Sequence, residues 1–248
     1  MESVKAVVIE NIQIAKDTYK MSLRSEIAAQ MQPGQFVNVQ VSGFYLRRPI
    51  SICEVVDKQH FVIIYKVVGD GTKKLSQLPA GHALGVLGPL GSGYPICAEE
   101  EAVLLIGGGV GVPPLYGLCR NLIEAGARPT VILGFNTERE VFYKEEFEKL
   151  GAEVLVATAD GSMGQKGFVT DVLRNIKEPA TFFYTCGPEP MLKALDKALA
   201  EGLEGEMSFE ERMGCGFGAC MGCSCETRYG AKRICKDGPV LERSEILW

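Results

Sequence analysis

The sequence predicts three parts in order: a small antiparallel β-barrel over residues 1–98, a doubly wound parallel α/β sheet over 99–208, and a cysteine-rich segment over 209–248. Three observations predict this order. Short β-type segments fill the first part, strands alternate with helices in the second, and glycine and cysteine crowd the third. With 46% apolar and 23% charged residues, the 248-residue chain can form more than one packed core.

The first part is rich in β-branched and aromatic residues, interrupted by turn signals such as Pro33-Gly34 and Gly69-Asp70-Gly71. Short strands at this spacing favour a small barrel with one helical turn at 72–78. The strands that we expect in it are 4–14, 19–23, 36–41, 50–56 and 61–68.

The second part alternates buried-type strands with helical patterns, which is typical of a parallel sheet of the Rossmann type. We expect strands at 102–106, 130–135, 153–158 and 181–185. We expect helices at 114–125, 143–150, 169–176 and 189–200. The last forty or so residues are too few for an apolar core of their own, and segments of this kind usually need a metal.

Charge and composition exclude several classes of function. The net charge is −5 and no basic block is present, which argues against a nucleic-acid or anionic-membrane surface. Only His60 and His82 are available for histidine-based catalysis. The first fifteen residues have no apolar leader pattern. We therefore expect a soluble cytoplasmic protein, in which clustered cysteines favour metal ligation over disulfides.

Four of the nine cysteines have diagnostic spacing: Cys215, Cys220, Cys223 and Cys235. The order C-x4-C-x2-C, followed by a fourth cysteine, is that of plant-type [2Fe–2S] sites. The surrounding glycines allow a tight loop whose N–H groups can point at sulfur. A zinc knuckle and inert thiols are the alternatives, although zinc ribbons prefer two closely paired ligand sets. Cys225 is a spare thiol that we do not expect to be a ligand.

A glycine turn follows the first strand of the second part, running from Gly107 through Gly109 and Gly111 to Pro113. Such a turn before a helix can bind a pyrophosphate through free N–H groups and the helix dipole. Val112 stands where the dinucleotide fingerprint has its third glycine, so a turn without a ligand remains an alternative. Cys186-Gly187-Pro188 closes the fourth strand and can face the same crevice, unless Cys186 is only a buried thiol.

Taken together, these motifs resemble the ferredoxin–NADP reductase superfamily. The resemblance runs in order through Pro33-Gly34-Gln35-Phe36-Val37, Arg48-Pro49-Ile50-Ser51, Gly69-Asp70-Gly71-Thr72, the glycine turn and Cys186-Gly187-Pro188. The cysteine spacing and the turn resemble one family within it, the electron-transfer subunits of NAD-dependent dihydroorotate dehydrogenases. This resemblance covers essentially the whole chain and implies a ferredoxin-reductase-like fold with an FAD-binding barrel, an NAD-binding domain and a [2Fe–2S] domain.

The resemblance also implies roles for individual residues. Arg48 would bind the FAD pyrophosphate, for which a planar guanidinium is suited, and Ser51 would lie near the reactive flavin nitrogen. Ile50 departs from the superfamily's usual tyrosine, so aromatic stacking is not expected there. The FAD-binding residues implied are Arg48, Pro49, Ile50, Ser51, Tyr65, Lys66, Val67, Gly71 and Thr72. The NAD-binding residues implied are Gly107, Gly109, Gly111, Pro113, Gly187 and Pro188. Ser51 and Cys186 are the candidate catalytic residues.

The family further implies a partner. A catalytic subunit with FMN oxidises dihydroorotate to orotate in pyrimidine biosynthesis, and electrons pass through [2Fe–2S] and FAD to NAD⁺ in a heterotetramer of two plus two subunits. Two alternatives remain: the flavin subunit of an NADH-dependent ferredoxin–NADP oxidoreductase or sulfide-dehydrogenase-type complex, and a zinc-stabilised nucleotide-binding module without redox activity. After the second sheet strand, Glu138 is the residue type that favours NAD, and Arg139 is the type that favours NADP. These two residues alone therefore do not decide between the two nucleotides.

Overall fold

A computed structural model describes residues 2–97, 102–176 and 179–248. The first part is a closed antiparallel barrel with strand order β1-β2-β5-β4-β3-β6. One short helix, α1 (Asp70–Ser76), and a 3₁₀ turn, Glu26–Gln30, are added to it. The strands are β1 (Glu2–Ala15), β2 (Thr18–Arg24), β3 (Phe36–Val39), β4 (Arg48–Val55), β5 (His60–Lys66) and β6 (Ala83–Leu90).

The barrel confirms the expected antiparallel architecture and adds one strand. β6 pairs with both β1 and β3 and so closes the barrel, but it was not predicted from the sequence. Gly85, Gly88 and Pro89 interrupt its pattern of β-branched residues, and such residues normally argue against a strand. The inward residues of all six strands form one apolar core, which includes Met21, Leu23, Phe61, Ile63 and Val86.

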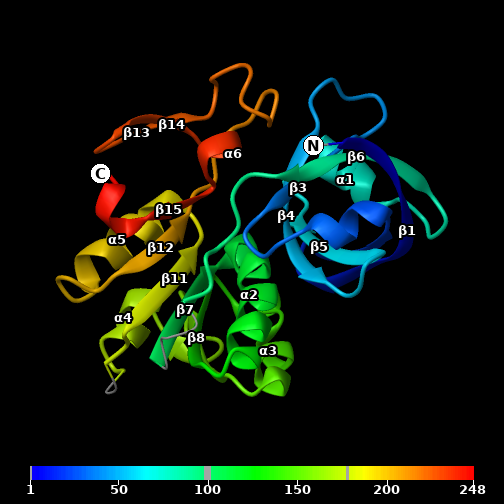
Figure 1. The fold of residues 1–248 in the computed structure, drawn as a ribbon. Helices are drawn as coiled ribbons and strands as arrows, with labels where there is room; N and C mark the ends of the chain where they lie inside the picture. Colours follow the sequence, from blue (N-terminus) through cyan, green and yellow to red (C-terminus); the bar gives the residue numbers. More distant parts are fainter. Residues whose placement is uncertain (1, 98–101, 177–178) are drawn as a thin grey trace.

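The second part is a sheet with strand order β10-β9-β8-β7-β11-β12-β15, flanked by helices (Figure 1). All its strand pairs are parallel except β12 with β15, as the alternation of strands and helices predicts. The strands from this part are β7 (Ala102–Gly108), β8 (Arg128–Phe135), β9 (Glu153–Thr158), β10 (Gln165–Lys166), β11 (Phe182–Cys186) and β12 (Gly205–Ser208). The helices are α2 (Pro113–Glu124), α3 (Lys144–Leu150), α4 (Val169–Leu173) and α5 (Glu189–Ala198).

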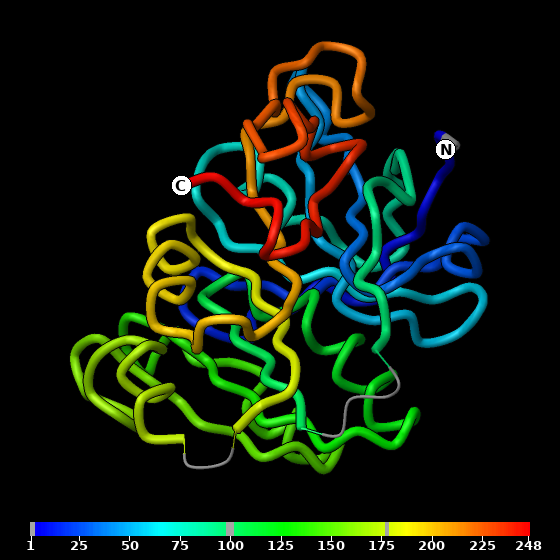
Figure 2. The backbone as a smooth tube through the Cα atoms, turned by 60° about the vertical axis from the view of Figure 1, so that its left-hand side comes forward, coloured from blue at the N-terminus to red at the C-terminus, as the bar shows by residue number. Residues whose placement is uncertain are grey.

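The cysteine-rich segment lies at one end of the molecule, against both the barrel and the edge of the sheet (Figures 1 and 2). It forms a hairpin of β13 (Ser224–Thr227) and β14 (Gly230–Arg233), then α6 (Ile234–Asp237) and β15 (Val240–Glu242). β15 joins the sheet edge antiparallel to β12. The segment is therefore attached to the sheet by backbone hydrogen bonds and is not a separate tail.

Barrel and sheet share a packed interface. Helix α2 lies against β4, where the Arg120 guanidinium pairs with the Glu54 carboxylate at 2.6 Å and donates to the Val55 carbonyl at 2.7 Å. Gly117 of α2 permits this approach, because a Cβ there would lie 2.9 Å from the Cys53 carbonyl oxygen. The predicted boundary at 98/99 lies outside the described residues. Within those described, no helix is long and apolar enough to cross a membrane.

Candidate functional site

A cavity of about 340 Å³ opens on the barrel side, where β4 and β5 face the start of the cysteine-rich segment. Seven of the nine predicted FAD-binding residues line it: Arg48, Pro49, Ile50, Ser51, Tyr65, Lys66 and, at the start of α1, Thr72. The structure therefore brings most of the predicted flavin residues to one pocket.

Arg48 is held against α1, at one end of this pocket. Its guanidinium lies 4.9 Å from the centre of the Phe44 ring, and it donates a hydrogen bond to the Leu46 carbonyl. A Cβ on Gly71 would overlap the Arg48 guanidinium, so a larger residue there would displace the guanidinium from its place against α1. The hydroxyl of Thr72 accepts from the N–H groups of Val68 (3.0 Å) and Gly69 (3.3 Å), which fixes the turn into α1. The turn and the cation suit a phosphate ligand.

Two predicted flavin residues are placed differently. Tyr65 lines the cavity, but its ring packs in the barrel core and its hydroxyl donates to Asn11 Oδ1 at 2.9 Å. Val67 does not line the cavity, whereas its exposed neighbour Val68 does. Both differences follow from the alternation of side chains along β5, which the sequence could not place in register.

A second cavity of about 550 Å³ lies at the carboxyl ends of the sheet strands. Gly109 and Pro188 line it, and the predicted glycine turn and the turn after β11 touch each other there. A Cβ on Gly111 would overlap the Cys186 carbonyl group, and one on Gly187 would lie 3.3 Å from the Gly108 nitrogen. The glycines of the two turns therefore permit close backbone contact. Gly107 is the penultimate residue of β7, and Pro113 occupies the first turn of α2, where its missing N–H costs no hydrogen bond.

Cys186 is buried at the end of β11, with 1% of its surface exposed, and lines neither cavity. Burial raises the pKa of its thiol, so the group is protonated at neutral pH. Ser208 and Tyr94 are its side-chain hydrogen-bond neighbours. Its catalytic role stays a prediction, as does that of Ser51, which lines the flavin-side cavity.

Three residues line both cavities: Lys66, Val110 and Glu210. Lys66 Nζ lies 3.2 Å from Glu140 Oε2. Burial opposes ionisation of Glu140, but hydrogen bonds from Asn136 and Lys66 outweigh it and lower its pKa. Burial raises the pKa of Glu210. Neither Val110 nor Glu210 is among the predicted site residues: Val110 stands between glycines of the turn, and the pair Glu210-Glu211 has the pattern of a solvated turn.

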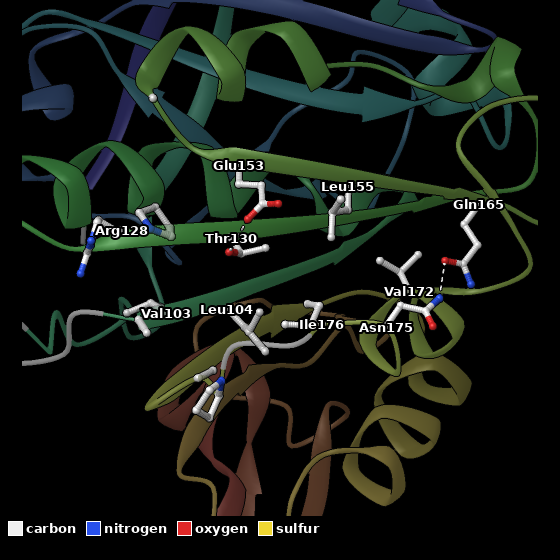
Figure 3. Close-up of a pocket in the computed structure, with 15 residues that line it drawn as sticks. Val103, Leu104, Arg128, Thr130, Glu153, Leu155, Gln165, Val172, Asn175 and Ile176 are labelled. Atoms are coloured by element: carbon white, nitrogen blue, oxygen red, sulfur yellow. Dashed lines mark hydrogen bonds between the residues drawn. The ribbon is translucent and has the colours of Figure 1, made fainter.

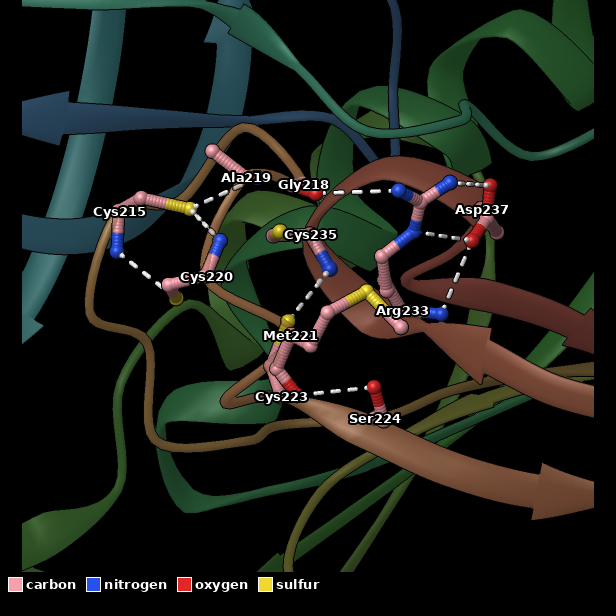
Figure 4. Close-up of polar contacts among 10 residues, drawn as sticks. All are labelled: Cys215, Gly218, Ala219, Cys220, Met221, Cys223, Ser224, Arg233, Cys235 and Asp237. Carbon is pink, nitrogen blue, oxygen red and sulfur yellow. Dashed lines mark hydrogen bonds and ion pairs between the residues drawn. The ribbon is translucent and has the colours of Figure 1, made fainter.

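The four predicted cluster cysteines form two pairs (Figure 4). Cys215 Sγ accepts from the backbone N–H of Ala219 (3.2 Å) and Cys220 (3.4 Å), and Cys220 Sγ accepts from Cys215 N–H (3.5 Å). Cys223 Sγ accepts from Cys235 N–H at 3.4 Å. Cys220 is exposed, whereas Cys223 and Cys235 are each 2% exposed. One pair is therefore open and the other is buried.

The pairs also differ in the ionisation of their thiols. Burial would raise the pKa of Cys215, but N–H groups of Phe217, Cys220 and Ala219 outweigh it and lower that pKa to about 6. Burial and the neighbouring Cys223 raise the pKa of Cys235 to about 12. Backbone N–H groups that stabilise a thiolate here can equally stabilise sulfur bound to iron.

Two thiol pairs, each with N–H groups aimed at sulfur, match a [2Fe–2S] group in which each iron takes two thiolates. Cys225, on β13, is half-buried, and burial raises its pKa.

A third cavity, of about 630 Å³, lies elsewhere, at the amino ends of β7, β8 and β9 (Figure 3). Its polar side chains pair among themselves: Thr130 Oγ1 with Glu153 Oε2 at 3.4 Å, and Asn175 Nδ2 with Gln165 Oε1 at 3.0 Å. Ligands of open α/β sheets bind at the carboxyl ends of the strands, so size alone does not make this cavity the functional site.

Comparisons with known proteins agree with this geometry. Residues 5–94 match the model for the oxidoreductase FAD-binding domain, and residues 105–197 match the oxidoreductase NAD-binding domain. Residues 210–247 match the iron-sulfur cluster binding domain of dihydroorotate dehydrogenase B. The chain is thus an oxidoreductase subunit of the ferredoxin-reductase-like class, with FAD-, NAD- and iron–sulfur-binding domains.

The particular family follows from the curated relatives. The chain is 45% identical to a protein of Fusobacterium nucleatum, over 99% of both chains, and 44% identical to one of Shouchella clausii, over 98% of this chain and 97% of that one. Both are named "Dihydroorotate dehydrogenase B (NAD(+)), electron transfer subunit". The chain belongs to this family of electron transfer subunits.

A solved structure of an NADH-dependent reduced ferredoxin-NADP oxidoreductase superposes with a TM-score of 0.89 and 31% identity, over 98% of this chain and 89% of that chain. A cytochrome P450 reductase of Amycolatopsis shares the fold at a TM-score of 0.68 and 23% identity, covering 79% of this chain and 65% of its own. The ferredoxin-reductase-like fold is therefore confirmed.

Proposed function

We propose that the chain accepts electrons from an FMN-containing catalytic subunit that oxidises dihydroorotate to orotate, and delivers them to NAD⁺ for pyrimidine biosynthesis. The observation that carries this proposal is the order of sites in one body: a flavin-side pocket shares walls with a nicotinamide-side pocket and borders the cysteine segment. When bound, FAD can exchange a hydride with a nicotinamide and single electrons with [2Fe–2S].

The chain's own residues contribute binding and positioning. Arg48 and the turn at Gly71 would hold the FAD pyrophosphate, and the touching turns at Gly111 and Gly187 would hold the nicotinamide nucleotide. Hydride transfer requires the reacting atoms at about 3–3.5 Å, which is a matter of orientation, and this suits a chain with two histidines. Ser51 and Glu210 are the side chains we assign to the flavin edge of this site.

Phe36 supports a route between the flavin-side pocket and the cluster. It lines that pocket and also packs in one apolar cluster with Cys223 and Cys235. The buried pair would thus face FAD, and the open pair, Cys215 and Cys220, would face the partner. We assign the assembly two subunits of each kind and a cytoplasmic location, which the nine free cysteines support.

A second candidate is supported by the solved structure at 31% identity: a flavin subunit of an NADH-dependent ferredoxin–NADP oxidoreductase. Co-expression with an FMN-containing barrel protein separates the two candidates. The first predicts co-purification, and NAD⁺ reduction by dihydroorotate only when both chains are present. Reduction of ferredoxin by the isolated chain with no response to dihydroorotate in the pair would favour the second.

The visible spectrum of the anaerobically purified chain tests the cofactors. We expect a flavin band and a broad iron–sulfur band, both bleached by NADH. Cys220→Ser should retain FAD and lose the broad band, because Cys220 lies on the exposed loop, away from the flavin-side pocket. An unchanged cluster spectrum in that variant would contradict the ligand assignment, and a colourless parent protein would contradict the proposed function.

A further inference from the structure

Asn38 lies on the outer face of β3, where the barrel meets the cysteine-rich segment. Its neighbours Val37 and Val39 point into the barrel core, so Phe36 and Asn38 share the opposite face. An amide on the outside of a barrel is normally hydrated, but Asn38 is only 2% exposed. The carboxamide is therefore enclosed between the barrel and the segment that covers it.

The carboxamide makes one directed contact with the cluster-binding loop. Asn38 Nδ2 donates to the carbonyl oxygen of Cys215 at 3.4 Å. Asn38 Oδ1 is buried and has no hydrogen-bond partner, the one such side-chain atom found in residues 2–97, 102–176 and 179–248. A flipped amide would set its oxygen against the Cys215 carbonyl oxygen, so the donor fixes the orientation. A leucine of similar shape would avoid the free-energy cost of burying the unpaired Oδ1. Because asparagine is present in spite of this cost, the position requires its Nδ2 donor.

The loop is seated directly on this amide. Gly216 has a φ of +76°, and a Cβ at that position would overlap Asn38 Nδ2. Phe36 lies two residues before Asn38, on the same face of β3. It packs in one apolar cluster with Cys223 and Cys235, and it lines the flavin-side pocket. A single face of β3 thus touches both cysteine pairs: Asn38 at the open pair and Phe36 at the buried pair.

We propose that Asn38 is a positioning residue for the iron–sulfur cluster: its carboxamide fastens the Cys215 end of the loop to the barrel that holds FAD. This inference rests on the proposed function, since it assumes that the four cysteines bind [2Fe–2S]. Asn38 acts through the Cys215 backbone and does not touch the sulfur atoms. The barrel strand thereby fixes the position of the Cys215 and Cys220 pair relative to the barrel. Without this contact, the loop alone would not fix that position.

Three variants of the intact holoprotein test the role of Asn38. Asn38→Leu keeps the approximate shape and removes the donor, and Asn38→Asp replaces the donor with an acceptor at nearly unchanged size. Gln40→Leu is the matched control, because Gln40 is an exposed amide two residues along the same face. The readouts are FAD content, the electron paramagnetic resonance spectrum of the dithionite-reduced protein, and the rate of iron release to a chelator.

Both Asn38 variants should retain FAD, shift the resonance spectrum of the reduced cluster, and release iron about tenfold faster than the parent, as for other groups that orient metal ligands. Asn38→Asp should have the larger effect, because two oxygens then face each other. If both Asn38 variants have the same spectra and iron-release rates as Gln40→Leu, the proposal is overturned. It is also overturned if Asn38→Leu leaves the cluster unchanged and only Asn38→Asp disrupts it. A parent protein without iron and flavin would instead refute the proposed function itself.

Discussion

The two sides of the cysteine-rich segment are attached by different physical means. The side that faces the barrel is apolar: Phe36 and Leu90 pack with Ile234 and Leu241, all at most 5% exposed. The side that faces the sheet combines apolar contacts with ion pairs. Val240 and Ile246 pack in the apolar clusters of the sheet part, and Arg243 pairs with Asp196 of α5 at 2.7 Å; Lys232 pairs with Glu245 within the segment.

This difference separates two tasks. Apolar packing carries no titratable charge, so it depends little on pH and suits the side on which the cluster must keep a fixed relation to FAD. Partly buried charges titrate and are screened, so the sheet side should respond to solution conditions. The barrel contact then fixes the position of the cluster, whereas the strength of the sheet contact changes with pH and salt. Each of the following predictions tests one side.

The largest expected effect is that of Phe36→Ala on the barrel side. The ring is 3% exposed and fills the space between the flavin-side pocket and the buried cysteine pair. Its removal should destabilise the protein by about 3–4 kcal/mol, through lost burial and a residual cavity. Urea unfolding followed by circular dichroism measures this loss. Tyr45→Ala, at a fully exposed aromatic residue of the barrel, is the control and should change stability by less than about 0.5 kcal/mol.

Gly91→Ala tests the same side with a smaller change. Gly91 has a φ of +73°, and a Cβ there would lie 2.8 Å from the Gly238 carbonyl oxygen, in the segment itself. We expect a loss of about 2–3 kcal/mol from backbone strain and displacement of the segment. Gly81→Ala is the control, since Gly81 has a similar φ of +83° with nothing near its Cβ. If both variants lose the same stability in urea unfolding, the barrel contact contributes nothing at this point.

Glu206→Gln tests the sheet side and has the smallest expected effect. Burial, with Glu242 and Glu245 nearby, raises the pKa of Glu206 from 4.5 to about 7. A carboxyl group with a raised folded-state pKa favours folding below pH 4.5, and this contribution is lost as pH rises through 7. After discounting for solvent screening, the loss should be about 1–2 kcal/mol.

Urea midpoints at pH 5 and pH 8 measure this dependence. Glu206→Gln should make the pH profile flatter and should be more stable than the parent at pH 8. Glu204→Gln, at an exposed position nearby, is the control. If the parent and Glu206→Gln lose the same stability between the two pH values, charge does not govern the sheet side.

Local patterns predicted the architecture well, because alternation and turn residues report directly on barrel strands and sheet strands. The strand β6 was missed, since Gly88 and Pro89 weaken its pattern and its stability comes from pairing with β1 and β3. β15 was missed because a three-residue strand is defined by its partner β12 and not by its own sequence.

For the four cysteines, spacing is the sequence signal of an iron–sulfur site, and their role as ligands stays a prediction. The division into an open pair and a buried pair was not predictable, because it depends on Phe36, which is distant in sequence. Likewise, the sequence weighed Glu138 and Arg139 beside the nicotinamide nucleotide, whereas the cavity is lined by Asn136 and Glu140. Such contacts arise from tertiary packing, which local patterns do not encode.

The wall shared by the two cavities has a thermodynamic consequence. Because Lys66, Val110 and Glu210 border both, a molecule that fills one cavity removes water from groups that face the other. Occupancies of the two sites are then linked, and linkage is reciprocal: if a bound dinucleotide shifts the midpoint potential of the flavin, the redox state of the flavin must shift dinucleotide affinity by the equivalent free energy.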